Sequence, residues 1–204
     1  SPFGRFPENR EHVIHTHPEW VTHDSSGESI LHYGAEHAVV DVIPAVFLEP
    51  GLPEVQNFVA VMVREIVTRY EVDGIHLDYI RYPTPEFGYH PANRSRFAAA
   101  YGVDPLDMVS WRMEEPETWT EGQRQLLKAW DQFRVDNITN VMRYIYWDVK
   151  QLRPDVLVSA AVVAELENDF SQTRRFQDWP SWVREGIVDA VIPMAYSTDP
   201  DTVL

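Results

Sequence analysis

The residues best suited to chemistry stand at the end of one short segment. Residues 72–83 read VDGIHLDYIRYP, in which apolar residues alternate with His76 and Asp78 until a proline ends the run. Such alternation predicts a short strand, and Asp78 lies at its carboxyl end. In parallel α/β proteins, that end of a strand carries the reactive groups. Asp78 is therefore the first candidate for a catalytic side chain.

A second carboxylate ends another apolar segment. In residues 156–165 every second side chain shares one face, and Glu165 comes last on that face. The same parity puts His76 and Asp78 on one face of their own strand, directed toward the axis if the strands belong to a barrel. Hydrolysis of a glycosidic bond needs two carboxyl groups, one ionised and one protonated. We therefore predict Asp78 as nucleophile or electrostatic stabiliser and Glu165 as general acid, with His76 and Arg81 as supports.

Each of these residues also has an ordinary structural role open to it. Asp78 could form an ion pair with Arg81, and Glu165 is one of several acids in a row. A histidine inside a barrel is more often a hydrogen-bonded packing residue than a general base. A donor beside Asp78 would nevertheless help to keep that carboxylate ionised. The hypothesis depends on the distance and orientation between the two carboxyl groups.

Aromatic residues gather in the segments expected to surround the same edge. They are Tyr79, Tyr82, Phe87, Tyr89, Trp111, Trp119, Trp179, Trp182 and Tyr196. Sugar rings stack their C–H faces on such side chains, and the hydroxyl groups bond to polar neighbours. We expect most of these rings to be packing residues and two or three to line a cleft. Tyr82 and Trp179 are the preferred candidates.

The elements that must position these residues alternate along the chain. The pattern predicts strands at 38–48, 73–78, 156–163 and 188–196, and helices at 53–70, 94–101, 123–151 and 178–185. This order implies α/β architecture with a parallel sheet and right-handed crossovers. A (β/α)₈ TIM-type barrel usually needs about 250 residues. We therefore expect residues 1–204 to form one partial barrel of about four strands, truncated at both ends.

Composition excludes several classes of partner. The chain has 204 residues, of which 32 are acidic and 17 basic, giving a formal net charge of -15. Such a surface disfavours nucleic acid and anionic lipid, and favours a neutral partner such as a polysaccharide. The sequence contains no cysteine and no apolar run of the ~20 residues that a membrane span requires. We predict no cofactor, and the oligomeric state is left open.

The amino-terminal histidines suggest an alternative in which a metal ion does the chemistry. His15 and His17 form an H-x-H pair, with His12 and His23 nearby. Two such residues on a strand point to one side, and imidazole is a good zinc ligand. Pro18 follows immediately and indicates a loop, however, and no third ligand has a suitable spacing. We therefore predict no metal and regard a zinc-dependent hydrolase as the least favoured alternative.

Seven segments, taken in order, resemble the bacterial glycosyl-hydrolase-like family ten. Besides VDGIHLDYIRYP they are HPEW at 17–20, LEPGLPEV at 48–55, FAAAYGVD at 97–104, WDQFRVDNIT at 130–139, QDW at 177–179 and PMAY at 193–196. The resemblance spans nearly the whole chain. It implies a (β/α)₈ barrel and an extracytoplasmic enzyme that hydrolyses peptidoglycan strands stripped of their peptides.

The same resemblance assigns roles to individual residues. Asp78 matches the signature acid of the family, and Asp178 with Trp179 matches a motif near the active-site face. We add Asp178 and Tyr196 to the substrate-binding candidates, which already include His76, Arg81, Tyr82 and Trp179. Glu49 departs from the family pattern, in which we expect an aspartate before Pro-Gly.

Two other interpretations of the same segments can be compared. VDGIHLDYIRYP also resembles the D-G-x-D-x-D-x-E strand of chitinase-type enzymes, but Ile80 stands where their catalytic acid would be. His76 replaces the middle aspartate, and Ser197 follows the M-x-Y motif. The sequence thus excludes the substrate-assisted mechanism of that class. A non-catalytic carbohydrate-binding barrel remains the main alternative to a glycoside hydrolase.

Overall fold

The computed structural model describes residues 9–33, 46–164 and 175–195. The chain divides into two compact units. Unit 1 comprises Ser1–Val55 and Pro83–Arg134, and unit 2 comprises Gln56–Tyr82 and Val135–Leu204. The long helices α2 (Pro53–Arg69) and α4 (Glu121–Leu152) each contribute residues to both units.

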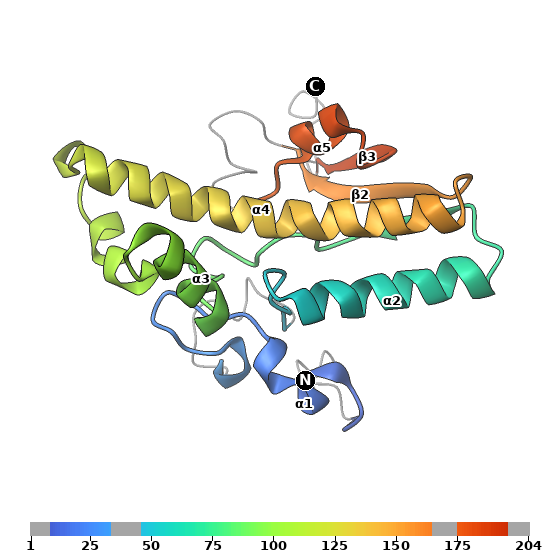
Figure 1. The fold of residues 1–204 in the computed structure, drawn as a ribbon, viewed down its shortest axis with the longest axis horizontal. Coiled ribbons are helices and arrows are strands. Elements are labelled where there is room, and N and C mark those ends of the chain that lie inside the picture. Colours follow the sequence, from blue (N-terminus) through green and yellow to red (C-terminus); the bar gives the residue numbers. More distant parts are fainter. Residues whose placement is uncertain (1–8, 34–45, 165–174, 196–204) are drawn as a thin grey trace. The chain divides into compact units, whose positions relative to one another are not determined.

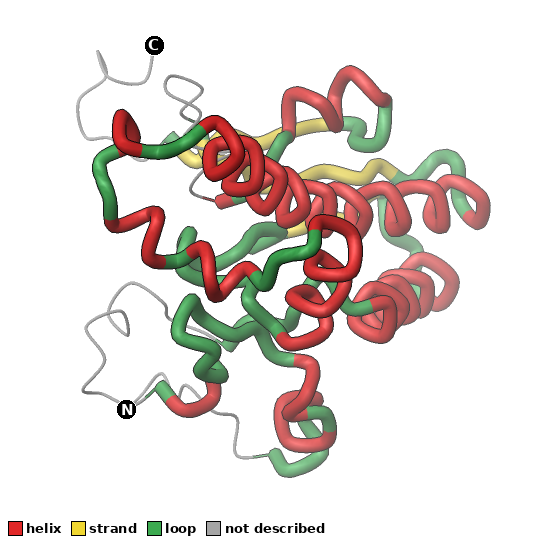
Figure 2. The backbone as a smooth tube through the Cα atoms, turned by 60° about the vertical axis from the view of Figure 1, so that its left-hand side comes forward, coloured by secondary structure: helices red, strands yellow, loops and turns green. Residues whose placement is uncertain are grey.

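Unit 2 is built on a parallel sheet of three strands in the order β1–β2–β3, drawn in yellow in Figure 2. The strands are β1 (Gly74–Leu77), β2 (Leu157–Val163) and β3 (Ala190–Met194). The short helix α5 (Trp179–Glu185) precedes β3. The expected alternation of helices and parallel strands is therefore confirmed for this part of the chain.

The two faces of the sheet differ as the strand parity predicts. On β2, Val158, Ala160 and Val162 are fully buried, whereas Leu157 on the opposite face is 57% exposed. Ile192 of β3 is also exposed. One face thus packs into the core of unit 2, and the other, here called the open face, exposes Leu157 and Ile192 although Ala161 on it is buried.

Helices α2 and α4 lie side by side within unit 2 (Figure 1). Arg64 of α2 donates two hydrogen bonds to the Asp148 carboxylate of α4, at 3.1 and 2.6 Å. Lys150 of α4 forms an ion pair with Asp189, the residue before β3, at 2.8 Å. These contacts join α2 to α4, and α4 to the residue before β3.

Most of these elements lie where the sequence predicts them, and their observed ends differ from the predicted ends by a few residues. Helix α2 begins at Pro53, whose fixed φ suits the first helical position. Helix α5 ends at Glu185 and is capped by Gly186, which adopts the left-handed conformation that such a cap favours. Most of the strand predicted at 38–48 lies outside the described residues. Within them, Leu48 forms an isolated antiparallel bridge with Val21.

The described residues of unit 1 have little regular backbone pairing. Unit 1 contains α1 (Val13–Thr16), α3 (Pro91–Tyr101), the first part of α4 and the 3₁₀ turns η1 (Pro18–Trp20), η2 (Ile30–His32), η3 (Pro105–Met108), η4 (Ser110–Met113) and η5 (Pro116–Thr118). Its core is a buried cluster of Tyr89, Phe97, Met108, Leu127 and Trp130. In the described part of this unit, packing of large side chains therefore forms the interior.

Buried polar side chains hold the loops of unit 1. Arg134 is fully buried, lies over the rings of Tyr89 and Trp130, and donates to the carbonyl oxygens of Pro85 and Phe87 at 2.6 and 2.9 Å. Glu49 is also fully buried. Its carboxylate accepts hydrogen bonds from the hydroxyl of Thr22 and the amide of Gly51. In these loops, side chains thus form hydrogen bonds with backbone groups that would pair with a neighbouring strand in a sheet.

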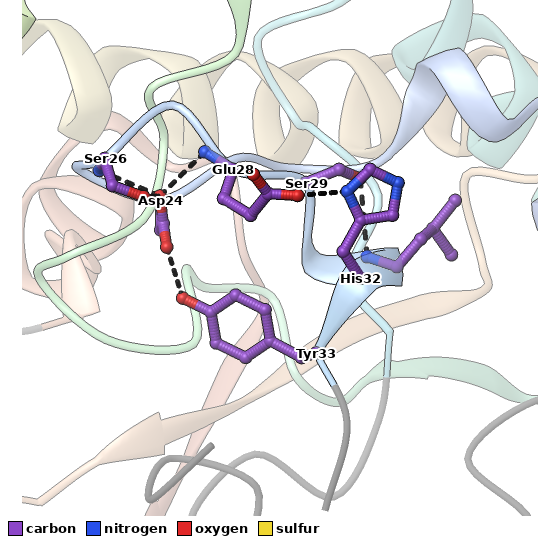
Figure 3. A network of polar contacts seen from close by, with 7 residues as sticks. Asp24, Ser26, Glu28, Ser29, His32 and Tyr33 are labelled. Atoms are coloured by element: carbon purple, nitrogen blue, oxygen red, sulfur yellow. Dashed lines mark hydrogen bonds and ion pairs between the residues drawn. The ribbon is translucent and has the colours of Figure 1, made fainter. Parts of the chain in front are cut away.

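The loop at 24–33 is organised around one carboxylate (Figure 3). Asp24 accepts hydrogen bonds from the amides of Ser26 and Glu28 and from the hydroxyl of Tyr33. Burial raises the pKa of Asp24, but these hydrogen bonds outweigh it and hold the pKa below its usual value. The ionised carboxylate therefore fixes the loop at neutral pH.

Among the residues that the structure describes, no helix combines the length and apolar character needed to cross a bilayer.

Candidate active site at the carboxyl edge of the sheet

Asp78 lies directly after β1, at the carboxyl edge of the parallel sheet, and is exposed. Its Oδ1 accepts a hydrogen bond from the Tyr79 amide at 2.7 Å. Tyr79 has a φ of 54°, so the chain turns sharply as soon as the strand ends. The turn orients the carboxylate while leaving it accessible, as a group that reacts with a substrate must be.

His76 lies on the open face of β1, as its parity predicts. It is the register partner of Ser159 on β2, and its Nδ1 lies 2.9 Å from the Ser159 hydroxyl. The imidazole is thus held by the neighbouring strand. Because side chains two positions apart on a strand share a face, His76 and Asp78 both belong to the open side.

Arg81 and Tyr82 follow within the turn after β1. The Arg81 guanidinium lies over the Tyr79 ring, 5.1 Å from its centroid, and forms no ion pair with Asp78. Tyr82 is only 1% exposed, and its hydroxyl accepts a hydrogen bond from Asn137 at 3.2 Å. The Tyr82 ring therefore packs inside unit 2 in this structure, and direct contact with a substrate stays a prediction.

Gln177 is a positioning residue that the sequence interpretation did not select. Its side chain is fully buried and accepts a hydrogen bond from the Val163 amide at 2.9 Å. It also donates to the carbonyl oxygens of Ala161 and Ile80 at 3.0 and 3.2 Å. One side chain thereby joins the segment after β1 to the end of β2. The only sequence signal was its place in the QDW motif, which does not reveal these partners.

Asp178 and Trp179 come next and lie at the same edge. Asp178 is the N-cap of α5 and accepts a hydrogen bond from the Ser181 hydroxyl at 2.7 Å. The Trp179 indole N–H donates to the Val163 carbonyl at 3.1 Å, so the ring is fixed at the carboxyl end of β2. The structure therefore brings the QDW motif and the turn after Asp78 to one edge of the sheet.

Two of the predicted site residues, Glu165 and Tyr196, lie outside the described residues. Glu165 follows one residue after Ala164, which is the last described residue beyond β2. Its assignment as general acid therefore stays a prediction.

The amino-terminal histidines are arranged differently from the pair considered in the zinc alternative. His15 lies in helix α1 and His17 caps its end, so the two do not occupy a strand. The Nδ1 of His17 bonds to the Glu19 carboxylate at 3.0 Å. Within residues 9–33, 46–164 and 175–195, no group of three or more His, Cys, Asp or Glu side chains could hold a metal ion. The described part of the chain thus gives the zinc alternative no support.

Comparison with known proteins identifies the protein family of this chain. The Glycosyl hydrolase-like 10 family matches residues 3–202, and the chain belongs to this family. The resemblance found in its motifs is thereby confirmed.

Two curated relatives show how far the similarity extends. The chain is 22% identical over 189 residues to Glycosyl hydrolase YngK of Bacillus subtilis strain 168, covering 92% of this chain and 32% of that protein. It is 25% identical over 167 residues to Glycosyl hydrolase DigH of Escherichia coli strain K12, covering 73% of this chain and 31% of that protein. The chain thus spans about a third of the length of these relatives.

Proposed function

We propose that this chain forms part of a glycoside hydrolase that cleaves a bacterial polysaccharide, in particular peptidoglycan-type glycan strands. The observation that carries the proposal is the exposed carboxylate of Asp78 at the carboxyl end of a parallel strand, in a member of a glycosyl hydrolase-like family. A polysaccharide substrate also suits a chain whose net charge of -15 disfavours polyanions. Action on cell-wall glycan implies a place outside the cytoplasm.

In this proposal Asp78 is the ionised carboxylate that attacks the anomeric carbon or stabilises its developing positive charge. The Tyr79 amide orients one oxygen of Asp78 and leaves the other for the substrate. Glu165, two positions after β2 in the sequence, donates the proton to the leaving group. The spacing of the two carboxyl groups decides the stereochemistry, with about 5–5.5 Å for retention and about 6.5–9.5 Å for inversion.

The remaining site residues bind the sugar or hold those that do. The indole ring of Trp179 is fixed by its hydrogen bond to β2 and supplies a flat surface for a pyranose. His76, Asp178 and Tyr196 supply polar groups for hydroxyls. Arg81 and Tyr82 act mainly by holding the turn that carries Asp78, since Arg81 lies over the Tyr79 ring and Tyr82 is buried.

A (β/α)₈ barrel is the architecture we propose around this site, with residues 1–204 as part of one barrel domain. Support comes from the open face of the sheet, where Leu157 and Ile192 are both more than half exposed. Apolar side chains on that face are the ones that a closed barrel buries along its axis. The parallel order β1–β2–β3 with helical connections is what a barrel of this type requires.

Replacement of Asp78 by asparagine tests the proposed function. We expect Asp78→Asn to lower the rate of reducing-end release from peptide-free glycan strands by about 10²–10⁴-fold, because the amide cannot attack or stabilise positive charge. The matched control is Asp73→Asn, which makes the same change at the opposite end of β1. Both variants should keep the circular dichroism spectrum of the wild type.

The outcome separates catalysis from simple binding. Turnover that Asp78→Asn leaves undiminished would remove Asp78 from the site. A wild-type chain that binds the glycan but releases no reducing ends would favour the non-catalytic carbohydrate-binding alternative.

A further inference from the structure

A second concave region lies within unit 1. It is a cavity of about 740 Å³, a volume typical of small-molecule sites. Its walls come from η1, from the loop at 23–32, from the start of α2 and from His90 before α3. Nothing in the predicted active site uses these residues.

A pair of stacked rings forms one wall of the cavity. The rings of His17 and Trp20 are 3.8 Å apart between centroids and nearly parallel, at 8°. Glu19 holds the His17 ring through its Nδ1. Flat, fixed aromatic surfaces of this kind suit the apolar face of a sugar ring, whose binding then costs little side-chain ordering.

For two further histidines of the wall, hydrogen bonds show which ring nitrogens are donors and which are acceptors. His90 accepts from the Ala92 amide at Nδ1 and donates from Nε2 to the Glu19 carbonyl, so both nitrogens of this ring have partners. His23 donates from Nδ1 to the Val21 carbonyl at 3.2 Å and meets the His90 ring edge-on. The Nε2 of His23 is consequently an acceptor.

Burial keeps His23 in that neutral state. Burial lowers the pKa of His23 below its ordinary value, and the adjacent His90 lowers it further. The hydrogen bond to the Val21 carbonyl and the nearby acids Asp24 and Glu28 oppose this shift without cancelling it. At neutral pH the cavity therefore gains no positive charge from this side chain.

The cavity wall carries two carboxylates, Glu19 and Glu54, and none of its described residues is lysine or arginine. The Glu19 carboxylate is already paired with the His17 ring. A ligand with a carboxylate or phosphate would meet these acids and the uncharged His23, with no lysine or arginine in the wall to balance its charge. A ligand with hydroxyl or amide N–H donors would meet acceptors.

We propose that this cavity, here called the histidine pocket, binds an uncharged pyranose with hydroxyl and acetamido groups and discriminates against sugars that carry a carboxylate. The inference rests on the proposed function, because it takes the ligand to be part of the glycan. In a strand that alternates a neutral acetamido sugar with a carboxylate-bearing one, the histidine pocket selects the neutral unit.

Titration of the full chain with two probes tests the proposal. N-acetylglucosamine trisaccharide is the neutral probe and N-acetylmuramic acid the carboxylate-bearing one, with the indole N–H signals of Trp20 and Trp179 followed by NMR. We expect the neutral probe to shift the Trp20 signal and the acidic probe to bind at least about 10-fold more weakly. A neutral probe that moves only the Trp179 signal, or equal affinity for both probes, would overturn the proposal.

Variants locate the binding and test the role of charge. Trp20→Ala should weaken the neutral probe about 10-fold, whereas Trp147→Ala, at an exposed tryptophan of α4 in unit 2, should leave it unchanged. In case Trp20→Ala fails to fold, Glu54→Lys provides a second test at an exposed position of the wall. Glu54→Lys should strengthen binding of the acidic probe, whereas Glu65→Lys on the same helix should not.

The same experiment distinguishes failure of the histidine pocket from failure of the proposed function. Asp78→Asn should keep both the Trp20 shift and the preference for the neutral probe. If hydrolysis is lost while binding is retained, the change affects the active site and leaves the histidine pocket intact. Normal hydrolysis with no Trp20 response refutes the histidine pocket alone.

Discussion

The carboxyl edge of the sheet in unit 2 and the histidine pocket of unit 1 hold polar groups in two different ways. At the edge, strand register decides which residues are neighbours, as it does for His76 and Ser159. In the histidine pocket, neighbours are set by side-chain bonds between loops, such as the bond from His90 to the Glu19 carbonyl. Backbone pairing is repetitive, whereas each loop contact is particular to its own residues.

This difference has a consequence for stability. The stability of a sheet comes largely from many backbone hydrogen bonds. Most of these remain when one side chain is lost. The loops of unit 1 depend on a few buried polar groups such as Arg134, which donates three hydrogen bonds. We therefore expect unit 1 to be more sensitive than unit 2 to the loss of a single polar side chain.

The largest effect should come from Arg134→Met. This change removes a buried cation and leaves the carbonyl oxygens of Pro85 and Phe87 without their donor. We expect a loss of about 3–5 kcal/mol in the free energy of unfolding, measured by urea titration. Arg64→Met removes an exposed ion pair with Asp148 and should cost less than about 1 kcal/mol. Equal losses for the two arginines would contradict the difference between the units.

A smaller effect is expected from Gln177→Leu at the sheet edge. Leucine has a similar size but leaves three backbone groups, at Ile80, Ala161 and Val163, without their partner. We expect a loss of about 2–4 kcal/mol in the free energy of unfolding. Gln125→Leu, at an exposed glutamine of α4, should stay within about 0.5 kcal/mol. A loss greater than that of Arg134→Met would reverse the proposed order.

The smallest effect concerns pH. Because the pKa of His23 is lowered in the folded protein, mainly by burial, the unfolded chain takes up a proton first as the pH falls through about 6.5. The contribution of His23 to stability is therefore complete above that pH and is lost as the pH falls toward the lowered value of the folded state. His23→Gln should reduce the difference between the free energies of unfolding at pH 7.5 and pH 5.5. His12→Gln, at an exposed histidine of the same unit, controls for the exchange, and an unaltered difference in His23→Gln would exclude this linkage.

Local pattern was sufficient to predict the elements that carry the candidate active site. Alternation over 72–83 gave the strand, its open face and the position of Asp78, since these depend only on neighbouring residues. Helix α5 and its cap Gly186 followed from similarly short-range signals. The sequence also shows that Tyr82 supplies a ring but not which side of the turn the ring faces, and in the structure it packs inside unit 2.

The sequence by itself determined the order of helices and strands, the parity of β1 and β2, and the family to which the chain belongs. Only the tertiary structure decided which distant groups meet. Gln177 reaches a carbonyl 97 positions away, and His90 reaches one 71 positions away. Periodicity encodes the conformation of a segment through contacts within a few residues, whereas these bonds exist only after separate segments have packed. The strand of Asp78 could therefore be predicted before the structure, and the groups that hold it in place could not.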